Sequence, residues 1–355
     1  TIIVTRPQLI KASVVSKQLG LKGIEEVILH TGQHFDANMS QQFIKELTLP
    51  MPDINLNINN VGHCVMTGRM MEGIAEAIKK INPDAILVYG DCNSTLAGAL
   101  AARQEGKKLI HVEAGLRSKN EVMPEELNRI VVDRISNFLF CPTQQAMLNL
   151  QKEGFEHLKK RVIFSGDVMM DAAIEYSTIA DRKSTIFEEN AEFQKGQYAL
   201  CTFHRAENIY AEKNIKDICS AVEDISKNMQ VIIPLHPATR KQLEHFRLKP
   251  KVCLIPPIGY LDMNLLIRNA RIVITDSGGL QKEAYFFNKF CVTLREETEW
   301  SELVDGGYSI LAGTQTDRIL EAVHQLCENK YIKLHQYYGE GSASKTIARY
   351  LVESQ

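Results

Sequence analysis

Short apolar runs alternate along the chain with longer stretches in which apolar positions recur every three or four residues. A continuous apolar run is typical of a strand buried on both faces of a parallel sheet, and the longer periodicity is typical of an amphipathic helix. In the first half, the pattern predicts strands over residues 2–4, 26–30, 85–89, 108–112 and 138–141. It predicts helices over residues 8–19, 38–47, 63–81, 94–105, 125–135 and 144–153.

The alternation begins again in the second half. Residues 161–165 form a strand or connector, a helix follows at 171–180, and residues 188–196 are polar and irregular. Further strands are predicted at 198–202, 230–234, 252–255, 272–275 and 291–294, with helices near 211–228, 238–246, 260–269, 280–287 and 317–328. Strands and helices that alternate in this way indicate βαβ units. We therefore predict an α/β protein with two Rossmann-like, doubly wound parallel sheets.

A chain of 355 residues is long enough for two domains. We predict one domain over residues 1–167 and a second over 168–341, with a final helix in 342–355 that packs back on the first. Ligands of open α/β sheets bind beyond the carboxyl ends of the strands. The active site is therefore expected in the cleft between the two domains.

The composition is that of an average globular protein, with 45% hydrophobic and 24% charged residues. A net charge of −2 indicates neither nucleic acid nor an anionic membrane as partner. The eight cysteines include no CxxC pair and stand mostly in apolar runs, which favours buried thiols in a reducing compartment over zinc ligands or disulfides. With no signal sequence and no run of about 18 apolar residues, we expect a cytoplasmic protein.

Polar residues follow the predicted strands of the first half. Arg6, at a strand-to-helix turn, suits a diphosphate, and a surface salt bridge is the alternative. Asp91 follows Gly90 and either caps the next helix or takes part in chemistry. Glu113 ends a buried strand, where an isolated charge is costly, so it is either functional or paired with Arg117.

A third carboxylate, Glu125, stands in the first turn of a predicted helix, where the helix dipole alone explains an acidic residue. Yet Asp91, Glu113 and Glu125 are all expected at one sheet edge. Three carboxylates there resemble acid/base machinery more than scaffold. His34, which follows the second strand, is either a ligand-binding or a structural histidine.

The second half has its own polar strand ends. His204 and Arg205 would place a general acid/base beside a phosphate clamp, and His236 ends the following strand. The segment Ser277-Gly278-Gly279 lies between a strand and a helix, where backbone N–H groups form an anion cradle. Glu283, one turn later, would accept hydrogen bonds from a ribose diol.

Several motifs are absent from the sequence. No GxGxxG follows the first strand, so a tightly bound NAD is not expected, and no Walker A sequence occurs. There is no HExxH or clustered Cys/His metal set, and no G-x-S-x-G elbow of a hydrolase.

Taken together, the polar segments resemble the non-hydrolysing UDP-N-acetylglucosamine 2-epimerase family over nearly the whole chain. The motifs that carry the resemblance are Thr5-Arg6-Pro7, Thr31-Gly32-Gln33-His34, Gly90-Asp91, His111-Val112-Glu113-Ala114-Gly115-Leu116-Arg117, Pro124-Glu125-Glu126-x-Asn128-Arg129, His204-Arg205-x-Glu207-Asn208 and Asp276-Ser277-Gly278-Gly279. Two further segments, Pro7-Gln8-x-Ile10-Lys11-Ala12 and His34-Phe35-Asp36-x-Asn38-Met39-Ser40, are more similar to the branch that acts on UDP-2,3-diacetamido uronic acids. Val4 departs from the family, which usually has glycine before its Arg-Pro motif.

The resemblance implies a glycosyltransferase-B-type fold, a homodimer, and neither a metal nor a nicotinamide cofactor. It places the catalytic positions at Asp91, Glu113, Glu125 and His204. The positions that match its nucleotide-diphosphate and ribose contacts are Arg6, His236, Ser277, Gly278 and Glu283. The residue pattern adds Lys11, Arg205 and Gly279 to the predicted UDP-sugar-binding set. The resemblance also implies a possible regulatory UDP-sugar site that involves Gln33, His34 and Arg69.

The implied activity inverts C2 of a UDP-N-acetylhexosamine by elimination of UDP and its re-addition to a glycal, a step in making precursors of cell-surface polysaccharides. Two enzymatic alternatives remain. A glycosyltransferase of the same fold would need an acceptor, and a hydrolysing epimerase would release UDP. A non-catalytic nucleotide-sugar sensor would keep the anion cradle but would not need the carboxylates.

Overall fold

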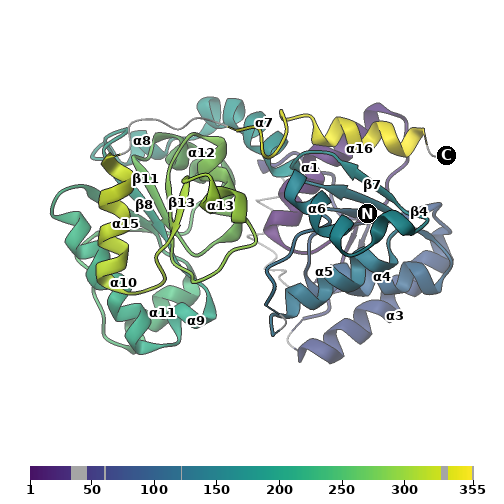
Figure 1. Cartoon of the computed structure of the whole chain (residues 1–355), viewed down its shortest axis with the longest axis horizontal. Coiled ribbons are helices and arrows are strands. Elements are labelled where there is room, and N and C mark those ends of the chain that lie inside the picture. Colours follow the sequence, from purple (N-terminus) through teal and green to yellow (C-terminus); the bar gives the residue numbers. More distant parts are fainter. Residues whose placement is uncertain (33–45, 60, 121, 329–334, 354–355) are drawn as a thin grey trace. The chain divides into compact units, whose positions relative to one another are not determined.

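A computed structural model describes residues 1–32, 46–59, 61–120, 122–328 and 335–353, which form two compact units (Figure 1). The first unit consists of Thr1–Ile174 and Gln336–Gln355, and the second of Glu175–His335. Each contains one parallel sheet with helices on both faces, so the predicted α/β fold with two Rossmann-like sheets is confirmed. Within the described part, none of the helices combines the length and the apolar character that a membrane span requires.

The first unit has seven described strands in the order β3-β2-β1-β4-β5-β6-β7, and every neighbouring pair is parallel. The strands are β1 (Ile2–Ile3), β2 (Leu29–His30), β3 (Ile54–Asn55), β4 (Ala85–Tyr89), β5 (Lys108–Val112), β6 (Phe138–Cys141) and β7 (Arg161–Phe164). The edge strand β3 is not among the predicted strands, because two half-buried residues carry too little pattern to reveal one.

The helices of the first unit cover both faces of its sheet (Figure 1). They are α1 (Arg6–Leu21), α3 (His63–Ile81), α4 (Asn93–Gln104), α5 (Pro124–Ile135), α6 (Gln144–Lys152), the 3₁₀ helix η1 (Phe155–His157) and α16 (Ala343–Val352). On one face α3, α4 and α5 enclose a core in which Met70, Val88 and Ala97 are inaccessible to solvent. The predicted helix at 38–47 lies mostly outside the described residues.

The helix α7 (Val168–Lys183) begins in the first unit and ends in the second. Near its start, the Asp171 carboxylate accepts hydrogen bonds from Ala343 N (3.0 Å) and Ser344 N (2.8 Å) and thereby caps α16. These bonds attach the last helix and the first turn of α7 to the same unit. The units therefore divide after residues 174 and 335, several residues from the boundaries expected at 167 and 341.

The second unit has six described strands in the order β10-β9-β8-β11-β12-β13. They are β8 (Tyr198–Thr202), β9 (Gln230–Pro234), β10 (Cys253–Ile255), β11 (Ile272–Thr275), β12 (Cys291–Thr293) and β13 (Ser309–Leu311). The helices are α8 (Ile186–Glu189), α9 (Ala206–Ile209), α10 (Glu212–Ser226), α11 (Pro237–His245), α12 (Tyr260–Asn269), α13 (Gly278–Phe286), α14 (Ser301–Asp305) and α15 (Thr316–Glu328). The prediction lacks β13 and the three shortest helices, one of which, α8, overlaps the stretch expected to be irregular.

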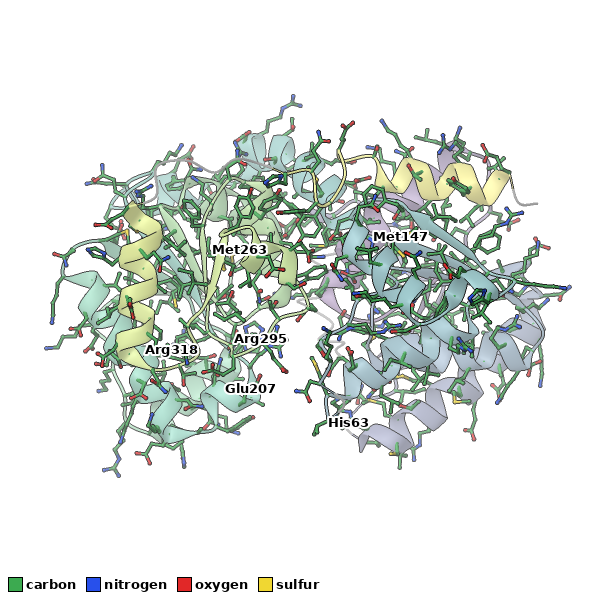
Figure 2. The ribbon with its side chains drawn as sticks, in the orientation of Figure 1. His63, Met147, Glu207, Met263, Arg295 and Arg318 are labelled. Atoms are coloured by element: carbon green, nitrogen blue, oxygen red, sulfur yellow. The ribbon has the colours of Figure 1, made fainter. Side chains whose placement is uncertain are left out.

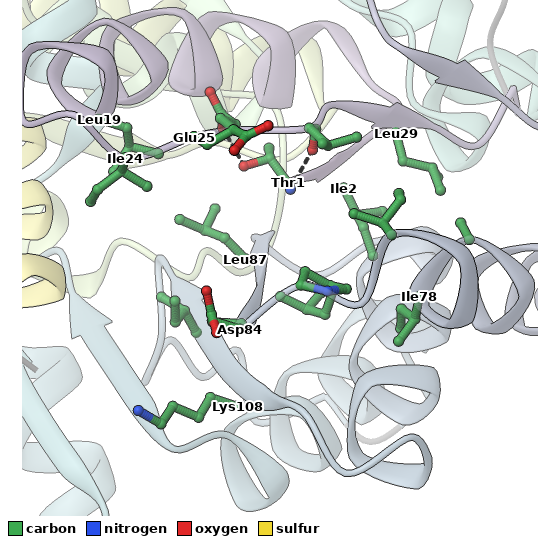
Figure 3. Close-up of a pocket in the computed structure, with 18 of the residues that line it drawn as sticks. Thr1, Ile2, Leu19, Ile24, Glu25, Leu29, Ile78, Asp84, Leu87 and Lys108 are labelled. Atoms are coloured by element: carbon green, nitrogen blue, oxygen red, sulfur yellow. Dashed lines mark hydrogen bonds between the residues drawn. The ribbon is translucent and has the colours of Figure 1, made fainter. Parts of the chain in front are cut away.

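Each sheet has one point at which the strand order reverses, between β1 and β4 in the first unit and between β8 and β11 in the second. Ligands of open α/β sheets bind at such switch points, beyond the carboxyl ends of the strands. A cavity of about 350 Å³ in the first unit lies at the other sheet edge, where Ala85, Lys108 and Phe138 begin their strands (Figure 3). The switch points therefore predict a ligand site at the carboxyl ends of the strands, opposite this cavity.

Candidate active site

In the first unit, Gln8 joins the two turns that flank the switch point. Its Oε1 accepts a hydrogen bond from Val4 N (2.8 Å), and its Nε2 donates to Tyr89 O (2.7 Å) and Thr95 Oγ1 (3.1 Å). The turn after β1 is thereby tied to the turn after β4. Arg6 is exposed at the first position of α1, so its proposed contact with a diphosphate stays a prediction.

Glu113 is the most unusual residue at this edge. It directly follows β5 with a backbone φ of +73°, a left-handed conformation that costs a non-glycine residue on the order of 1–3 kcal/mol. Its carboxylate forms an ion pair with Lys11, and the two side chains are only 11% and 7% exposed. A Cβ atom at Gly90 would lie 3.1 Å from Glu113 Oε2, so the glycine leaves room for the carboxylate.

Arg117 is not the partner of Glu113, although the sequence left that pairing open. Its Nε and Nη2 donate to the two carboxylate oxygens of Glu153 at 2.7 and 2.8 Å, and its Nη1 donates to Asp133 Oδ2 at 2.7 Å. Lys11 takes the place expected for Arg117, because it lies one turn into α1 and reaches the end of β5. Its assignment to UDP-sugar binding remains a prediction.

A fully buried ion cluster supports the turn after β4. Asp133 Oδ1 lies 2.7 Å from His111 Nδ1, and His111 Nε2 lies 2.8 Å from Gly90 O. Both ring nitrogens of His111 therefore lie within hydrogen-bond distance of an oxygen atom. Burial alone would raise the pKa of Asp133, but hydrogen bonds and charge from His111 and Arg117 outweigh it and lower the pKa.

Asp91 belongs to a second cluster at the same edge. Arg129 contacts Asp91 Oδ2 through Nη2 (2.6 Å) and Nε (2.8 Å), and Asn128 Nδ2 donates to Asp91 O (2.8 Å). Asp91 does not cap α4, because Cys92 occupies the N-cap position and no side chain caps the helix. Burial raises the pKa of Asp91, the charge of Arg129 opposes this, and the charge of Glu113 raises the pKa further.

The electrostatic coupling of these carboxylates is testable. We expect the Asp91 carboxyl to titrate above its usual pKa of 3.8, because it is desolvated although its side chain is 33% exposed, and because Glu113 is negatively charged. Glu113→Gln removes that charge and should lower the Asp91 pKa, whereas Lys11→Met removes an opposing charge and should raise it. Carboxyl ¹³C NMR titration measures both changes, and an Asp91 pKa that is the same in all three proteins would contradict the coupling.

The two acidic residues in the first turn of α5 have different environments. Glu126 is buried; its Oε2 accepts from Ser118 N (2.9 Å) and Arg129 Nη1 (2.7 Å), and its Oε1 from Lys119 N (3.0 Å). It therefore holds a loop in place. Glu125 is half-buried, and within the described part of the chain its carboxylate makes no hydrogen bond or ion pair. The structure thus joins Asp91 and Glu113 electrostatically but not Glu125.

In the second unit, Asp276 organises the turns at the switch point. It is inaccessible to solvent, and its Oδ2 accepts hydrogen bonds from His204 N (2.9 Å), Arg205 N (2.9 Å) and Asn208 Nδ2 (3.0 Å). The backbone after β8 is thereby held against the backbone after β11. The Arg205 side chain extends toward Glu207, with Nη1 3.5 Å from Oε1.

The second unit brings together two of the predicted histidines. The rings of His204 and His236 stack with their centroids 5.3 Å apart and an interplanar angle of 30°. His236 Nδ1 accepts a hydrogen bond from Ala238 N (3.2 Å), so His236 caps α11. The cap fixes one ring nitrogen and leaves the other directed away from the helix backbone.

The predicted anion cradle lies at the start of α13. Ser277 is the N-cap, and its own N–H donates to Thr275 Oγ1 (3.0 Å). The N–H groups of Gly278 and Gly279 form no hydrogen bond within the described residues, as expected in a first helical turn. A Cβ atom at Gly279 would have only one neighbour, 3.9 Å away, so an anion has room to approach there.

Glu283 lies deeper than the sequence indicated. It is only 4% exposed and is close to Tyr260, whose pKa is raised by burial and, in addition, by the charge of Glu283. Its contact with a ribose therefore stays a prediction beside this structural role. The neighbouring Lys282 is also buried, with Nζ 3.9 Å from the centre of the Trp300 ring.

The proposed regulatory residues are only partly described. Gln33 and His34 lie outside the described residues. Arg69 is exposed on α3, where within the described chain it forms no hydrogen bond or ion pair. At the start of the same helix, His63 Nδ1 lies 2.9 Å from Asn93 Nδ2, which connects α3 to the turn that carries Asp91 (Figure 2).

The supporting residues Arg129, His111, Asp133 and Asp276 are absent from the sequence-based site. A local signal existed for two of them. His111 is a polar residue inside a run that is otherwise apolar, and Asp276 directly follows a buried strand. The sequence does not show which residues these two side chains contact, however. The hydrogen-bond partner of His111 is 22 residues away, and that of Asp276 is 72 residues away.

Comparison with known proteins gives matches over nearly the whole chain. The sequence profile of one family, described as UDP-N-acetylglucosamine 2-epimerase, matches residues 18–352. A UDP-2,3-diacetamido-2,3-dideoxy-D-glucuronate 2-epimerase from Pseudomonas aeruginosa is 46% identical, covering 99% of both chains. A UDP-N-acetylglucosamine 2-epimerase from Methanococcus maripaludis is 41% identical, covering 98% of this chain and 96% of the relative. The crystal structure of the Methanocaldococcus jannaschii UDP-GlcNAc 2-epimerase in complex with UDP-GlcNAc and UDP has a TM-score of 0.92 at 37% identity, covering 99% of this chain and 98% of that one.

Proposed function

This chain belongs to the UDP-N-acetylglucosamine 2-epimerase family, and we propose from that membership that it is an isomerase that inverts C2 in the sugar of a UDP-sugar. The observation that carries the proposal is the backbone conformation of Glu113 together with its ion pair. A left-handed glutamate, held by Lys11 beside a second carboxylate with a raised pKa, is a costly arrangement that a scaffold does not need.

The chemistry requires more than removal and return of a proton. The hydrogen on C2 of an N-acetylhexosamine is not acidic, since no carbonyl carbon is attached to C2. We propose that a base takes this proton while the C1–O bond to UDP breaks, so that the electrons of the C–H bond form a C1–C2 double bond. The electron pair of the broken C1–O bond leaves with UDP. Re-addition of UDP to C1 and protonation of C2 from the opposite face complete the inversion.

Asp91 and Glu113 are the proposed acid/base residues of this reaction. A carboxyl group whose pKa lies nearer to neutrality exchanges protons more effectively, and burial shifts Asp91 in that direction. Glu113 is held at the end of β5 by its ion pair with Lys11, and this fixed carboxylate is the second proposed acid/base residue. Glu125 is proposed as a further carboxylate of the set, supported by its lack of a partner among the described residues.

The residues of the second unit are proposed to hold UDP while its phosphate gains charge. The free N–H groups of Gly278 and Gly279 at a helix start, together with His204, His236 and Arg205, suit a departing diphosphate. Arg6 and Lys11 are proposed to contribute positive charge, and Glu283 a ribose contact.

We propose a UDP-2,3-diacetamido uronic acid as the substrate, with UDP-N-acetylglucosamine as the second candidate. The 46% identity to the enzyme named for the first substrate supports this order, against 41% to one named for the second. The segments around Lys11 and His34 agree with it.

Proton NMR in D₂O with each substrate separately tests the proposal. We expect a C2 epimer that carries deuterium at C2, no acceptor requirement, and no net release of UDP, with faster turnover of the diacetamido uronate. Release of free sugar and UDP would instead indicate a hydrolysing epimerase. No reaction until an acceptor is added would indicate a glycosyltransferase, and binding with no exchange under any condition would indicate a sensor.

A homodimer, a cytoplasmic location and a regulatory site that includes Arg69 are further parts of the proposal. The homodimer and the regulatory site follow from the family resemblance. The location is supported by the cysteines, all eight of which are described and free of disulfides. Sedimentation analysis tests the dimer. If Arg69 belongs to a regulatory site, Arg69→Ala should reduce the change in epimerisation rate that added UDP-sugar causes in the unaltered protein.

A further inference from the structure

The second unit contains a buried carboxylate oxygen aimed at a histidine. Asp276 Oδ2 has three donors, but within the described part of the chain Asp276 Oδ1 makes no hydrogen bond and is inaccessible to solvent. His204 Nδ1 lies 3.6 Å away, just beyond hydrogen-bond distance. From this geometry we propose that Asp276 is a positioning residue that holds His204 in the Nδ1–H tautomer and directs its Nε2 to the departing phosphate.

The physical reason is the cost of a buried acceptor that lacks a donor. Leaving a carboxylate oxygen unsatisfied in the interior is unfavourable, and a small rotation of the His204 ring closes the 3.6 Å gap. The bond can form only if Nδ1 carries a hydrogen. In the neutral ring, Nε2 is then free of hydrogen and able to accept a proton, and the positive ring that results has a buried counter-charge at Asp276.

The surroundings restrict the ring further. The three hydrogen bonds to Oδ2 hold Asp276 in place, two of them from the backbone of His204 and Arg205 themselves. The ring of His204 is 40% exposed and stacks on His236, so rotation about the stacking axis is the movement that remains. Among the described residues, Asp276 and His236 are the titratable groups recorded against the His204 ring, while the Arg205 side chain extends toward Glu207.

This inference rests on the proposed function and adds one step to it. When the C1–O bond breaks, the leaving phosphate oxygen takes up the electron pair. Before this step His204, whose ring is 40% exposed, takes a proton from solvent at Nε2. It then donates a hydrogen bond from Nε2 to the leaving oxygen and keeps this proton through the reverse step. Asp276 takes no part in this proton transfer, so the protons taken from and returned to C2 still pass through the carboxylates of the first unit.

The decisive variant is Asp276→Asn. Asparagine has the same size as aspartate and keeps one oxygen to accept the three hydrogen bonds. Its NH₂ group takes the place of Oδ1 and can only donate to His204 Nδ1, so Nδ1 must then carry no hydrogen. We expect kcat to fall at least ~10²-fold, a typical acid/base contribution, with KM changed less than about threefold. Imidazole ¹⁵N NMR should show Nδ1–H in the unaltered protein and Nε2–H in the variant.

Thr202→Ser is the matched control. Thr202 is buried beside the same strands, and serine keeps its hydroxyl, which lies 2.7 Å from Thr275 Oγ1. The Thr202→Ser variant should show the same Nδ1–H tautomer of His204 and the same kcat as the unaltered protein. A folded Asp276→Asn variant with normal kcat and an unchanged His204 tautomer would overturn the inference.

The ¹⁵N measurement also separates this inference from the proposed function. If the variant does not fold, an Nε2–H tautomer of His204 in the unaltered protein is sufficient to overturn it. If neither UDP-sugar exchanges its C2 hydrogen, the proposed function fails, while the tautomer measurement still decides whether Asp276 orients His204.

Discussion

Glu113→Gln should reduce kcat at least ~10²-fold, and Asp91→Asn should have an effect of the same order, because each substitution removes a proposed proton acceptor while nearly preserving its shape. At Glu113 the loss is expected in kcat more than in KM. The carboxylate is 11% exposed and paired with Lys11, so the amide also leaves a buried ammonium group without its counter-charge. Single-turnover measurement of C2 deuterium incorporation reports the chemical step directly.

Glu105→Gln is a matched control for Glu113→Gln. It also breaks a lysine–glutamate pair in the first unit, with Lys79 Nζ 3.3 Å from Glu105 Oε1, but the lysine is 67% exposed. A surface pair of this kind contributes about 0–1 kcal/mol to stability and nothing to the chemistry. Near-normal deuterium incorporation in both Glu113→Gln and Asp91→Asn would disprove the assignment of the acid/base residues.

Asp133→Asn is expected to lower the free energy of unfolding by about 3–5 kcal/mol near pH 7. The buried Asp133 carboxylate contacts His111 Nδ1 (2.7 Å), Gly115 N (3.1 Å) and Arg117 Nη1 (2.7 Å). An asparagine has no charge to balance the Arg117 guanidinium, which is only 7% exposed, and its NH₂ group would face one of the donors. Urea denaturation measures the change.

The pH dependence of this effect has a definite sign. The pKa of Asp133 is lower in the folded protein than its usual 3.8, so its ionised form stabilises the fold. This contribution is complete above the unfolded-state pKa and is lost as the pH falls through the folded-state value. The stability difference between the unaltered protein and Asp133→Asn should therefore shrink below about pH 3.8.

Asp181→Asn is the comparison for this second experiment. Asp181 also pairs with an arginine, Arg268, at 3.0 Å, but it is 52% exposed. Its removal should change the unfolding free energy by less than about 1 kcal/mol. Equal losses in Asp133→Asn and Asp181→Asn would show that burial of the Asp133 cluster does not determine its contribution.

The sequence by itself determined the fold class and most of its elements. Strands buried on both faces read as continuous apolar runs, and β4, β5, β6, β8, β9 and β11 have the predicted bounds. It also placed Asp91, Glu113, His204 and Ser277 at strand ends, since the carboxyl edge of a parallel sheet is where polar residues follow apolar ones.

Only the tertiary structure decided which of these residues act on one another. Glu113 has Lys11 as its partner and not the nearby Arg117, because α1 and β5 are brought together across 102 residues of chain. The left-handed backbone of Glu113 and the buried oxygen of Asp276 also leave no mark in the local pattern. Hydrophobic periodicity records which face of an element is buried, whereas ion pairs and hydrogen bonds depend on distances between elements that only the packed sheet establishes.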